Sequence, residues 1–304
     1  MHRMTRTLVA ALALLIPPAA LASDADQKSQ EVLKAAREAL GGEEKLASIR
    51  TVTAKGKHRR MMGEMQIAGE TEIALALPDK YVRSQTDTMM GNTMTREAGF
   101  NGETPLERVN SMGGGHAMVV RMGGPGGPGA PADPEARRAA MLRNQRAESA
   151  RLTLGWLLSA PALPGATFTY AGEAESPDGR AHVIDVKAGD GFAARLFIDQ
   201  QSSRPLMLTY MAPQPIVRVM RQGPGEARPR QPHAGADEIA REIHAQGPPP
   251  VVEHQLFFDD FREVDGVWLP HRISRSIKGE PAEELELEKI RINDDIKAST
   301  FEAK

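Results

Sequence analysis

The chain contains 304 residues, with 38 basic and 40 acidic side chains, no cysteine, 15 methionines and only 4% aromatic residues. The lack of cysteine excludes disulfides, thiol catalysis, thiolate metal sites and the acylated cysteine of a bacterial lipoprotein. A nearly balanced charge does not favour nucleic acid as a partner. Because aromatic rings are few, flexible methionine side chains must supply part of the apolar volume.

The N-terminus, residues 1–22, has the three-part layout of a secretory signal peptide. Arg3 and Arg6 begin it, an apolar run interrupted by prolines follows, and small residues end it at Ala22. The apolar run is about 15 residues long, shorter than the ~20 residues that a membrane-spanning helix needs. We therefore expect cleavage near Ala22 and a mature chain, residues 23–304, that is soluble in the periplasm and has no transmembrane anchor.

After this leader, helical spacing changes to strand alternation. Apolar residues at helical spacing predict a helix over residues 26–40, ended by a glycine pair, and a short helical turn over 43–49. In residues 66–77 apolar and polar residues alternate, which is typical of a half-buried antiparallel strand. We expect about three to five strands between residues 49 and 100, one of them over 80–85.

Two stretches rich in glycine and proline follow, at residues 112–134 and 213–250. Such compositions bury too little apolar surface to offset the entropy of ordering, so we interpret both as flexible insertions. The second contains a candidate helix over residues 236–246. Between the insertions, Pro134 predicts the start of a helix that ends before Pro161.

Strand alternation returns after this helix. It predicts one group of strands over residues 166–173, 180–187, 192–199 and 205–211, and a final group over 251–262, 267–277 and 283–293. The turns within the first group are hairpin-sized, so strands that are neighbours in sequence are expected to pair as a meander.

The last predicted strand contains an irregularity. Its apolar positions are odd at Leu285 and Leu287 but even at Ile290. A slip of one residue exchanges the two faces of a strand unless a bulge absorbs it. We therefore predict a β-bulge at Glu288-Lys289.

Several segments resemble the outer-membrane lipoprotein-sorting superfamily, which includes the periplasmic carrier LolA and its receptor LolB. The resemblance covers most of the mature chain in order, and it is carried by the segments LKAAREALGGEEKLASIRTVTAKG, ALPDKYVR, FNGETP, ARLFIDQQSSRPLML, FDDFREVDGVWLPHRI and ELEKIRIND. It implies an unclosed antiparallel barrel of about eleven strands around a hydrophobic cavity for acyl chains or other apolar ligands, with helices as a lid. The two insertions distinguish this chain from the small carrier proteins of the superfamily. The resemblance therefore does not imply that this protein carries lipoproteins.

The residues alone lead to a similar architecture. A sheet with one aliphatic face must cover that face, and this chain offers few helices for about ten strands. Curling the sheet round a lid helix solves the problem. The expected fold is mainly β (α+β): an unclosed antiparallel β-barrel of about ten to eleven strands with a helical lid, forming one domain with two insertions.

The expected function is that of a periplasmic, non-enzymatic carrier or sensor that holds lipid or an acyl chain in the half-barrel. The sequence contains no nucleophile elbow, HExxH motif, phosphate loop or dinucleotide-binding glycine motif, so we expect no catalytic residues, cofactor or metal. The candidates for ligand contact are the apolar residues of the alternating faces and of the helix: Ile67, Ile73, Leu75, Trp156, Phe168, Tyr170, Leu196, Ile198, Leu206, Leu208, Trp268 and Ile273.

Two alternative functions stay open. One is an envelope interaction module that contacts another protein through its loops. The other is a soft-metal protein in which His58 and methionines such as Met61, Met62 and Met94 bind Cu(I). Strand alternation would point Met61 and Met62 to opposite faces, which favours adaptable apolar packing over copper binding. Trp268 is interpreted as either a core residue or part of a cavity rim.

Overall fold

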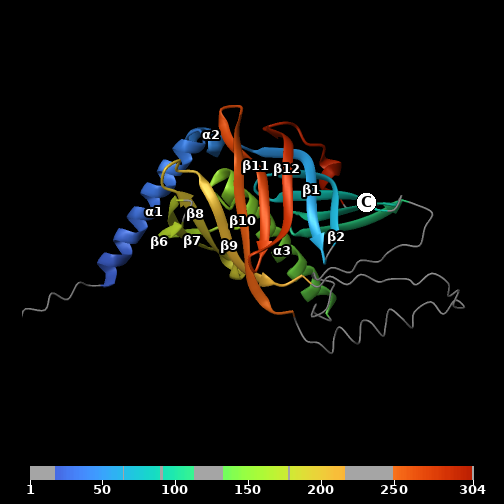
Figure 1. The fold of residues 1–304 in the computed structure, drawn as a ribbon, viewed down its shortest axis with the longest axis horizontal. Helices are drawn as coiled ribbons and strands as arrows, with labels where there is room; N and C mark the ends of the chain where they lie inside the picture. Colours follow the sequence, from blue (N-terminus) through green and yellow to red (C-terminus); the bar gives the residue numbers. More distant parts are fainter. Residues whose placement is uncertain are drawn as a thin grey trace, which may run out of the picture.

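The computed structural model describes residues 18–63, 65–89, 92–112, 133–176, 179–215 and 249–302. Most of the predicted leader, the interiors of both insertions and the candidate helix at 236–246 lie outside the described residues. The described chain consists mainly of strands, with α-helices before the first strand and between the fifth and sixth (Figure 1).

Twelve antiparallel strands form one sheet in the order β5-β4-β3-β2-β1-β12-β11-β10-β9-β8-β7-β6. The pairing of β1 with β12 joins an N-terminal meander to a C-terminal one. The edge strands β5 and β6 stand at opposite ends of this order, so the barrel is unclosed. The strands are β1 (Thr51–Met62), β2 (Met65–Ala76), β3 (Lys80–Met89), β4 (Asn92–Asn101), β5 (Thr104–Met112), β6 (Thr167–Ser176), β7 (Gly179–Lys187), β8 (Ala193–Asp199), β9 (Pro205–Pro213), β10 (Val251–Val264), β11 (Val267–Ile277) and β12 (Glu280–Ile292).

The predicted fold class is confirmed, with twelve strands in place of ten to eleven. The strand that the sequence did not reveal is β5. Its aliphatic residues Leu106 and Val109 are three positions apart, and this spacing does not match the period of two that marks a half-buried strand. Pairing with β4 along its whole length imposes the extended conformation instead.

The predicted bulge in β12 is confirmed. Gly56 of β1 pairs with Leu287, and the residue before Gly56 pairs with Lys289, so Glu288 has no partner on β1. This extra residue brings Leu287 and Ile290 to the same face, and both are buried. The bulge therefore keeps the apolar side of β12 continuous despite the change from odd to even positions.

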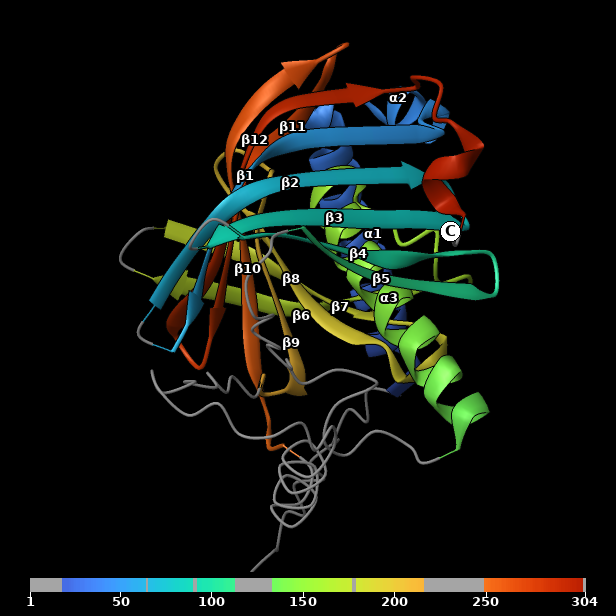
Figure 2. The ribbon, with the colours of Figure 1, turned by 90° about the vertical axis from the view of Figure 1, so that its right-hand side faces the viewer.

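Three α-helices are described: α1 (Pro18–Leu40), α2 (Glu43–Ser48) and α3 (Pro134–Leu157). The helices predicted over residues 26–40, over 43–49 and from Pro134 are confirmed, although α1 begins at Pro18, before the predicted start at residue 26. The sheet curves round α3 (Figure 2), which contacts β3, β4, β5, β9 and β11, whereas α1 contacts β6 and β11. Both long helices thus cover the concave face of the sheet.

The start of α3 follows from its first residues. The carboxylate of Asp133 accepts a hydrogen bond of 2.8 Å from the backbone N–H of Ala136, and Pro134 occupies the first turn, where no donor is needed. Near its other end Gly155 lies against the ring of Phe258, and a Cβ at this glycine would come within 2.2 Å of the ring. The missing side chain lets α3 approach β10 closely.

The main core lies between the helices and the concave face of the sheet. Fully buried members come from both layers, such as Leu40 of α1, Trp156 of α3 and Leu196 of β8. A smaller cluster of Ala74, Val82 and Phe301 forms where the 3₁₀ helix η2 (Ala298–Phe301) packs on the sheet, and a second 3₁₀ helix, η1 (Gly189–Gly191), precedes β8. In the described part of the chain, no helix is both long and apolar enough to cross a membrane.

Candidate functional site

Most of the ligand-contact candidates lie together in the main core. Seven of them are at most 2% exposed, namely Ile73, Leu75, Trp156, Leu196, Ile198, Leu208 and Ile273. Phe168 and Tyr170 of β6 are partly buried and pack against this core. Ile67 of β2 is buried but does not belong to this cluster. Their contact with a ligand stays a prediction, because these side chains pack against one another.

Leu206 and Trp268 are more peripheral. Alternation predicted Leu206 on the same face as Leu208, but β8 pairs Phe197 with Met207 and Ile198 with Pro205. Leu206 is therefore the extra residue of a bulge, and it is 41% exposed. Trp268 lies at the edge of the core, where the guanidinium of Arg204 lies 4.3 Å from the centre of its ring.

The most distinctive concave region lies where β1, β3, β4, β11 and β12 face α3. It contains a cavity of about 770 Å³. Apolar and aromatic groups line part of its wall, among them Tyr81, Ala98 and Ile277. The rest of the wall is charged, with five cationic side chains (Arg60, Arg83, Arg96, Arg275 and Lys278) and three carboxylates (Glu148, Glu280 and Glu283).

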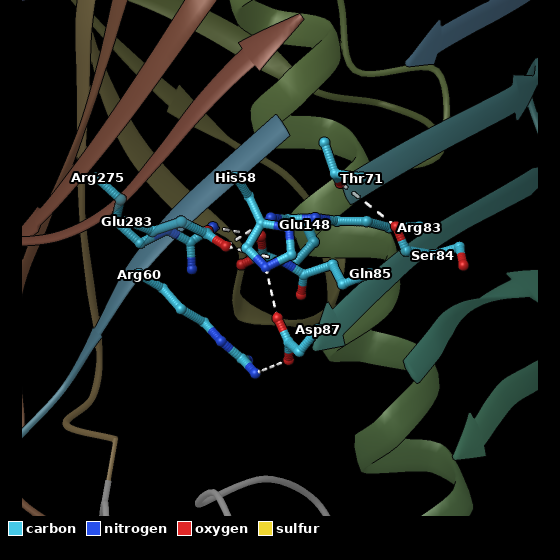
Figure 3. Close-up of polar contacts among 10 residues, drawn as sticks. All are labelled: His58, Arg60, Thr71, Arg83, Ser84, Gln85, Asp87, Glu148, Arg275 and Glu283. Carbon is cyan, nitrogen blue, oxygen red and sulfur yellow. Dashed lines mark hydrogen bonds and ion pairs between the residues drawn. The ribbon is translucent and has the colours of Figure 1, made fainter. Parts of the chain in front are cut away.

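Glu283 of β12 is bound from β3 on the same concave face (Figure 3). Its Oε1 accepts a hydrogen bond of 2.6 Å from Nη2 of Arg83 and one of 3.0 Å from Nε2 of Gln85. Burial alone would raise the pKa of Glu283, but the charges of Arg83 and Arg275 outweigh it and lower the pKa to about 2. This carboxyl is therefore ionised at any pH above the acid range.

Glu148 joins α3 to the sheet in the same way. Nη2 of Arg275 donates to its Oε2 at 2.7 Å, and Nη1 of Arg151, one turn along α3, donates to its Oε1 at 2.8 Å. Burial again opposes ionisation, yet the charges of Arg275 and Arg151 lower the pKa of Glu148 to about 2. Arg151 also lies over the ring of Tyr210, with its guanidinium carbon 3.8 Å from the ring centre.

A second buried cluster lies beside the cavity. Nε2 of His58 is 2.8 Å from Oδ1 of Asp87, and Nη2 of Arg60 donates to Oδ2 of the same carboxylate. All three residues are less than 10% exposed. Figure 3 shows this cluster on β1 and β3, next to the pairs of Glu148 and Glu283. Asp87 is therefore the shared partner of a histidine and an arginine that the sheet holds away from solvent, and it compensates the charge of Arg60.

The cavity carries more positive than negative charge. Five cations and three carboxylates line it, and Asp87, which lies beside the cavity and binds Arg60, reduces the formal excess to one positive charge. Arg96 of β4 shows the consequence, because burial and the charge of Arg60 lower the pKa of its guanidinium. A wall that combines charged and apolar groups is typical of a site for a ligand that has both a polar part and a hydrocarbon part.

The sequence predictions missed these charged residues, although a signal for them exists. In β3 the alternating positions Tyr81, Arg83, Gln85 and Asp87 share the concave face, so a polar run continues from an aromatic residue of the core. The alternation of apolar residues does not by itself reveal a polar run of this kind. The partners Glu148 and Arg275 come from elements far apart in sequence, and pattern alone does not bring them together.

The copper hypothesis gains no support from the described residues. His58 is engaged by Asp87, whereas Met61 is 44% exposed. The side chain of Met62 lies outside the described residues. Over the described ranges, no group of three or more histidine, aspartate and glutamate side chains is placed to hold a metal ion.

A search of solved structures finds similar chains. They include a LolA superfamily protein from Nitrosomonas europaea (8% identity, 90% of this chain and 97% of that one, TM-score 0.46) and a candidate outer membrane lipoprotein-sorting protein domain from Vibrio parahaemolyticus (9%, 91% and 97%, 0.42). A DUF1329 family protein from Desulfovibrio piger is similar at 8% identity, with 90% and 97% covered and a TM-score of 0.43. No family model matches the sequence, and no curated protein matches it. The strand order and the helix contacts define the class of fold as an unclosed antiparallel half-barrel with helices on its concave face.

Proposed function

We propose that this protein is a non-enzymatic carrier or sensor of the bacterial periplasm that binds lipid or another acyl-chain ligand on the concave face of its half-barrel. The observation that carries the proposal is the cavity of about 770 Å³ between α3 and the sheet, with apolar groups beside charged ones. This volume falls within the range of about 300–1,000 Å³ that is usual for small-molecule sites.

The energetics of such binding are favourable. Each methylene removed from water contributes about 0.8 kcal/mol, so a 14-carbon chain contributes around 10 kcal/mol before ordering costs. Tyr81, Ala98 and Ile277 give the chain an apolar surface at the cavity. The resemblance of the sequence to lipoprotein sorting proteins, whose cavities hold acyl chains, supports the same class of ligand.

The predicted leader supports a periplasmic location. Its cleavage near Ala22 would leave Ser23 as the new N-terminus. Mass spectrometry of protein recovered from the periplasm of the host cell tests this, and an intact residue 1 on the recovered chain would contradict it.

The ligand itself is testable by native mass spectrometry. Protein purified from its own periplasm should carry co-purifying lipid, and the delipidated protein should bind a fluorescent fatty acid. Ala98→Trp is expected to fill the cavity and abolish this binding, whereas Ala68→Trp, at an exposed position of β2, should leave it unchanged. Equal binding by both variants would rule out this cavity as the site.

A further inference from the structure

Tyr210 of β9 has a buried hydroxyl that finds no hydrogen-bond partner among the described residues. The residue is 4% exposed, and its ring stacks on that of His254 of β10 with the ring centres 5.1 Å apart. Over the ranges that the structure describes, neither ring nitrogen of His254 has a partner at hydrogen-bond distance and angle. Because buried polar groups normally have partners, these atoms mark a place where a bound molecule would supply one.

Tyr210 lines a cavity of about 500 Å³ between α3 and the strands β7, β8 and β9. No described residue lines both this cavity and the one of about 770 Å³ (the first cavity). Part of the wall is apolar and well buried, since four of its side chains are at most 7% exposed, namely Leu163, Val186, Phe192 and Ala194. The two cavities therefore lie against different strands, and each combines apolar with polar groups.

We propose that this cavity is a second ligand site, which takes an uncharged amphiphile with an ester or amide carbonyl. The hydroxyl of Tyr210 donates a hydrogen bond to the carbonyl oxygen, and the hydrocarbon chain lies along Val186 and Phe192. This site goes beyond the proposed function, because it is a different cavity and binds a different polar group. The reasons are the chemistry of the free donors and the charges around them.

The groups at Tyr210 are suited to an acceptor. Burial raises the pKa of Tyr210, so the phenol keeps its proton and can donate it. Nε of Arg151 is a second buried donor without a partner in the described chain, and the guanidinium carbon of Arg151 lies 3.8 Å from the ring centre of Tyr210. Burial and the charges of Arg275 and Arg151 lower the pKa of His254, so its ring is neutral, although the backbone of Pro213 opposes this shift.

The charges beside Tyr210 disfavour an ionised head group. Arg151 already binds Glu148, whose pKa of about 2 keeps it ionised. An anion at the hydroxyl would lie near this carboxylate and compete with it for Arg151, and a cation would lie near Arg151 itself. A carbonyl brings no charge that needs compensation and loses less hydration on burial than an ion does. It is therefore the acceptor that fits these donors.

The test uses the delipidated full chain and four probes of similar chain length. These are methyl decanoate, N-methyldecanamide, decanoate and methyl decyl sulfide, which lacks a carbonyl. Calorimetry should show that the ester and the amide bind about three- to tenfold tighter than the sulfide, the factor that one neutral hydrogen bond supplies. With an isotope-labelled carbonyl, the infrared stretch of the bound ester should lie below its position in hydrocarbon solvent, because a hydrogen bond lowers its frequency.

Matched variants locate the carbonyl. Tyr210→Phe removes only the hydroxyl, so it should lower the affinity for the ester and the amide about three- to tenfold and move the infrared band back toward its position in hydrocarbon. It should change neither the affinity for the sulfide and decanoate nor the free energy of unfolding. Ala147→Trp, on the α3 wall of this cavity, should abolish binding of the ester, whereas Ala98→Trp in the first cavity should abolish binding of decanoate alone.

The outcomes separate this inference from the proposed function. An unchanged ester affinity in Tyr210→Phe, or an unshifted infrared band, would mean that the hydroxyl binds only water, and would overturn the inference even if Ala147→Trp did not fold. Equal weakening of the ester and the sulfide, or a less stable ligand-free protein, would assign the hydroxyl a structural role and overturn it as well. Loss of ester binding in Ala98→Trp but not in Ala147→Trp would place the ester in the first cavity, which would overturn the second site and support the proposed function. Failure of decanoate to bind, with the ester results as expected, would overturn the first cavity as a lipid site and leave the second.

Discussion

Arg275 of β11 donates a hydrogen bond of 2.7 Å to Glu148 of α3, although 127 positions separate the two residues in sequence. This pair links α3 to the sheet, and both of its residues line the charged cavity. Because both side chains are largely removed from water, each is costly to leave without its partner. The pair therefore contributes to the position of α3 as well as to the electrostatics of the cavity.

We predict that Arg275→Met destabilises the protein by about 2–3 kcal/mol, because Glu148 would keep only Arg151 as a partner in a partly buried setting. The double variant Glu148→Gln with Arg275→Met should recover part of this loss, since no uncompensated charge remains. Urea unfolding measures both. Arg272→Met, at an exposed position of the same strand, is the control, and an equal loss of stability in it would contradict the role of the pair.

Acid should destabilise the protein through Glu148 and Glu283. Each has a pKa of about 2 in the folded chain against an ordinary value of 4.5, so the unfolded chain binds more protons between these values. The stabilisation is complete above about pH 4.5 and is lost as the pH falls toward 2. Urea unfolding at pH 7, 4.5 and 3 should show this loss, and Glu283→Gln should reduce its slope. An unchanged slope in this variant would show that other groups cause it.

The sequence was informative about the sheet because strands with one buried face carry a period of two. This pattern located β2, the meander from β6 to β9 and the last three strands, and the break in the pattern at Leu287 and Ile290 predicted the bulge of β12. It failed for β5, whose aliphatic residues are three positions apart, and for Leu206, because a bulge in β9 leaves this residue unpaired. Tertiary pairing decided both cases.

The candidate site was less accessible to sequence patterns. Apolar candidates such as Ile73 and Leu196 were correctly grouped on one face, and the structure shows them packed in the core. The cavity wall depends instead on charged residues that meet across the fold, as Arg83 meets Glu283 over 200 positions. A charged side chain on a strand resembles a solvated one in sequence, and only the curvature of the sheet determines which charges face inward.

The contact between Gly155 and Phe258 gives a packing prediction. Gly155→Ala improves helix propensity by up to about 1 kcal/mol, yet its Cβ would lie 2.2 Å from the Phe258 ring. We expect a net destabilisation of about 1–3 kcal/mol, because α3 would have to move away from β10. The double variant Gly155→Ala with Phe258→Leu should lose less stability than the sum of the losses of the two single variants, as thermal unfolding would show. Purely additive losses would contradict the steric explanation.

The bulge of β12 allows an unusual deletion. Removal of Glu288 would leave Leu287, Lys289 and Ile290 in regular alternation, and their present partners on β1 would then form a continuous ladder. The lost pair between Glu288 and Lys57 is well exposed, so its removal should matter little. We therefore expect the deletion to cost about 1 kcal/mol or less in free energy of unfolding.

Deletion of Glu286 from the regular part of the same strand is the matched control. It would make Leu285 and Leu287 direct neighbours, which point to opposite faces, so one buried leucine would be exposed at a cost of about 2 kcal/mol or more. Urea unfolding of the two deletion variants compares the loss of Glu288, which has no partner on β1, with the loss of Glu286, which is paired with Lys57. If deletion of Glu288 destabilised the protein as much as deletion of Glu286, the bulge would be needed for the curvature of the sheet and not only to absorb a slip in the sequence pattern.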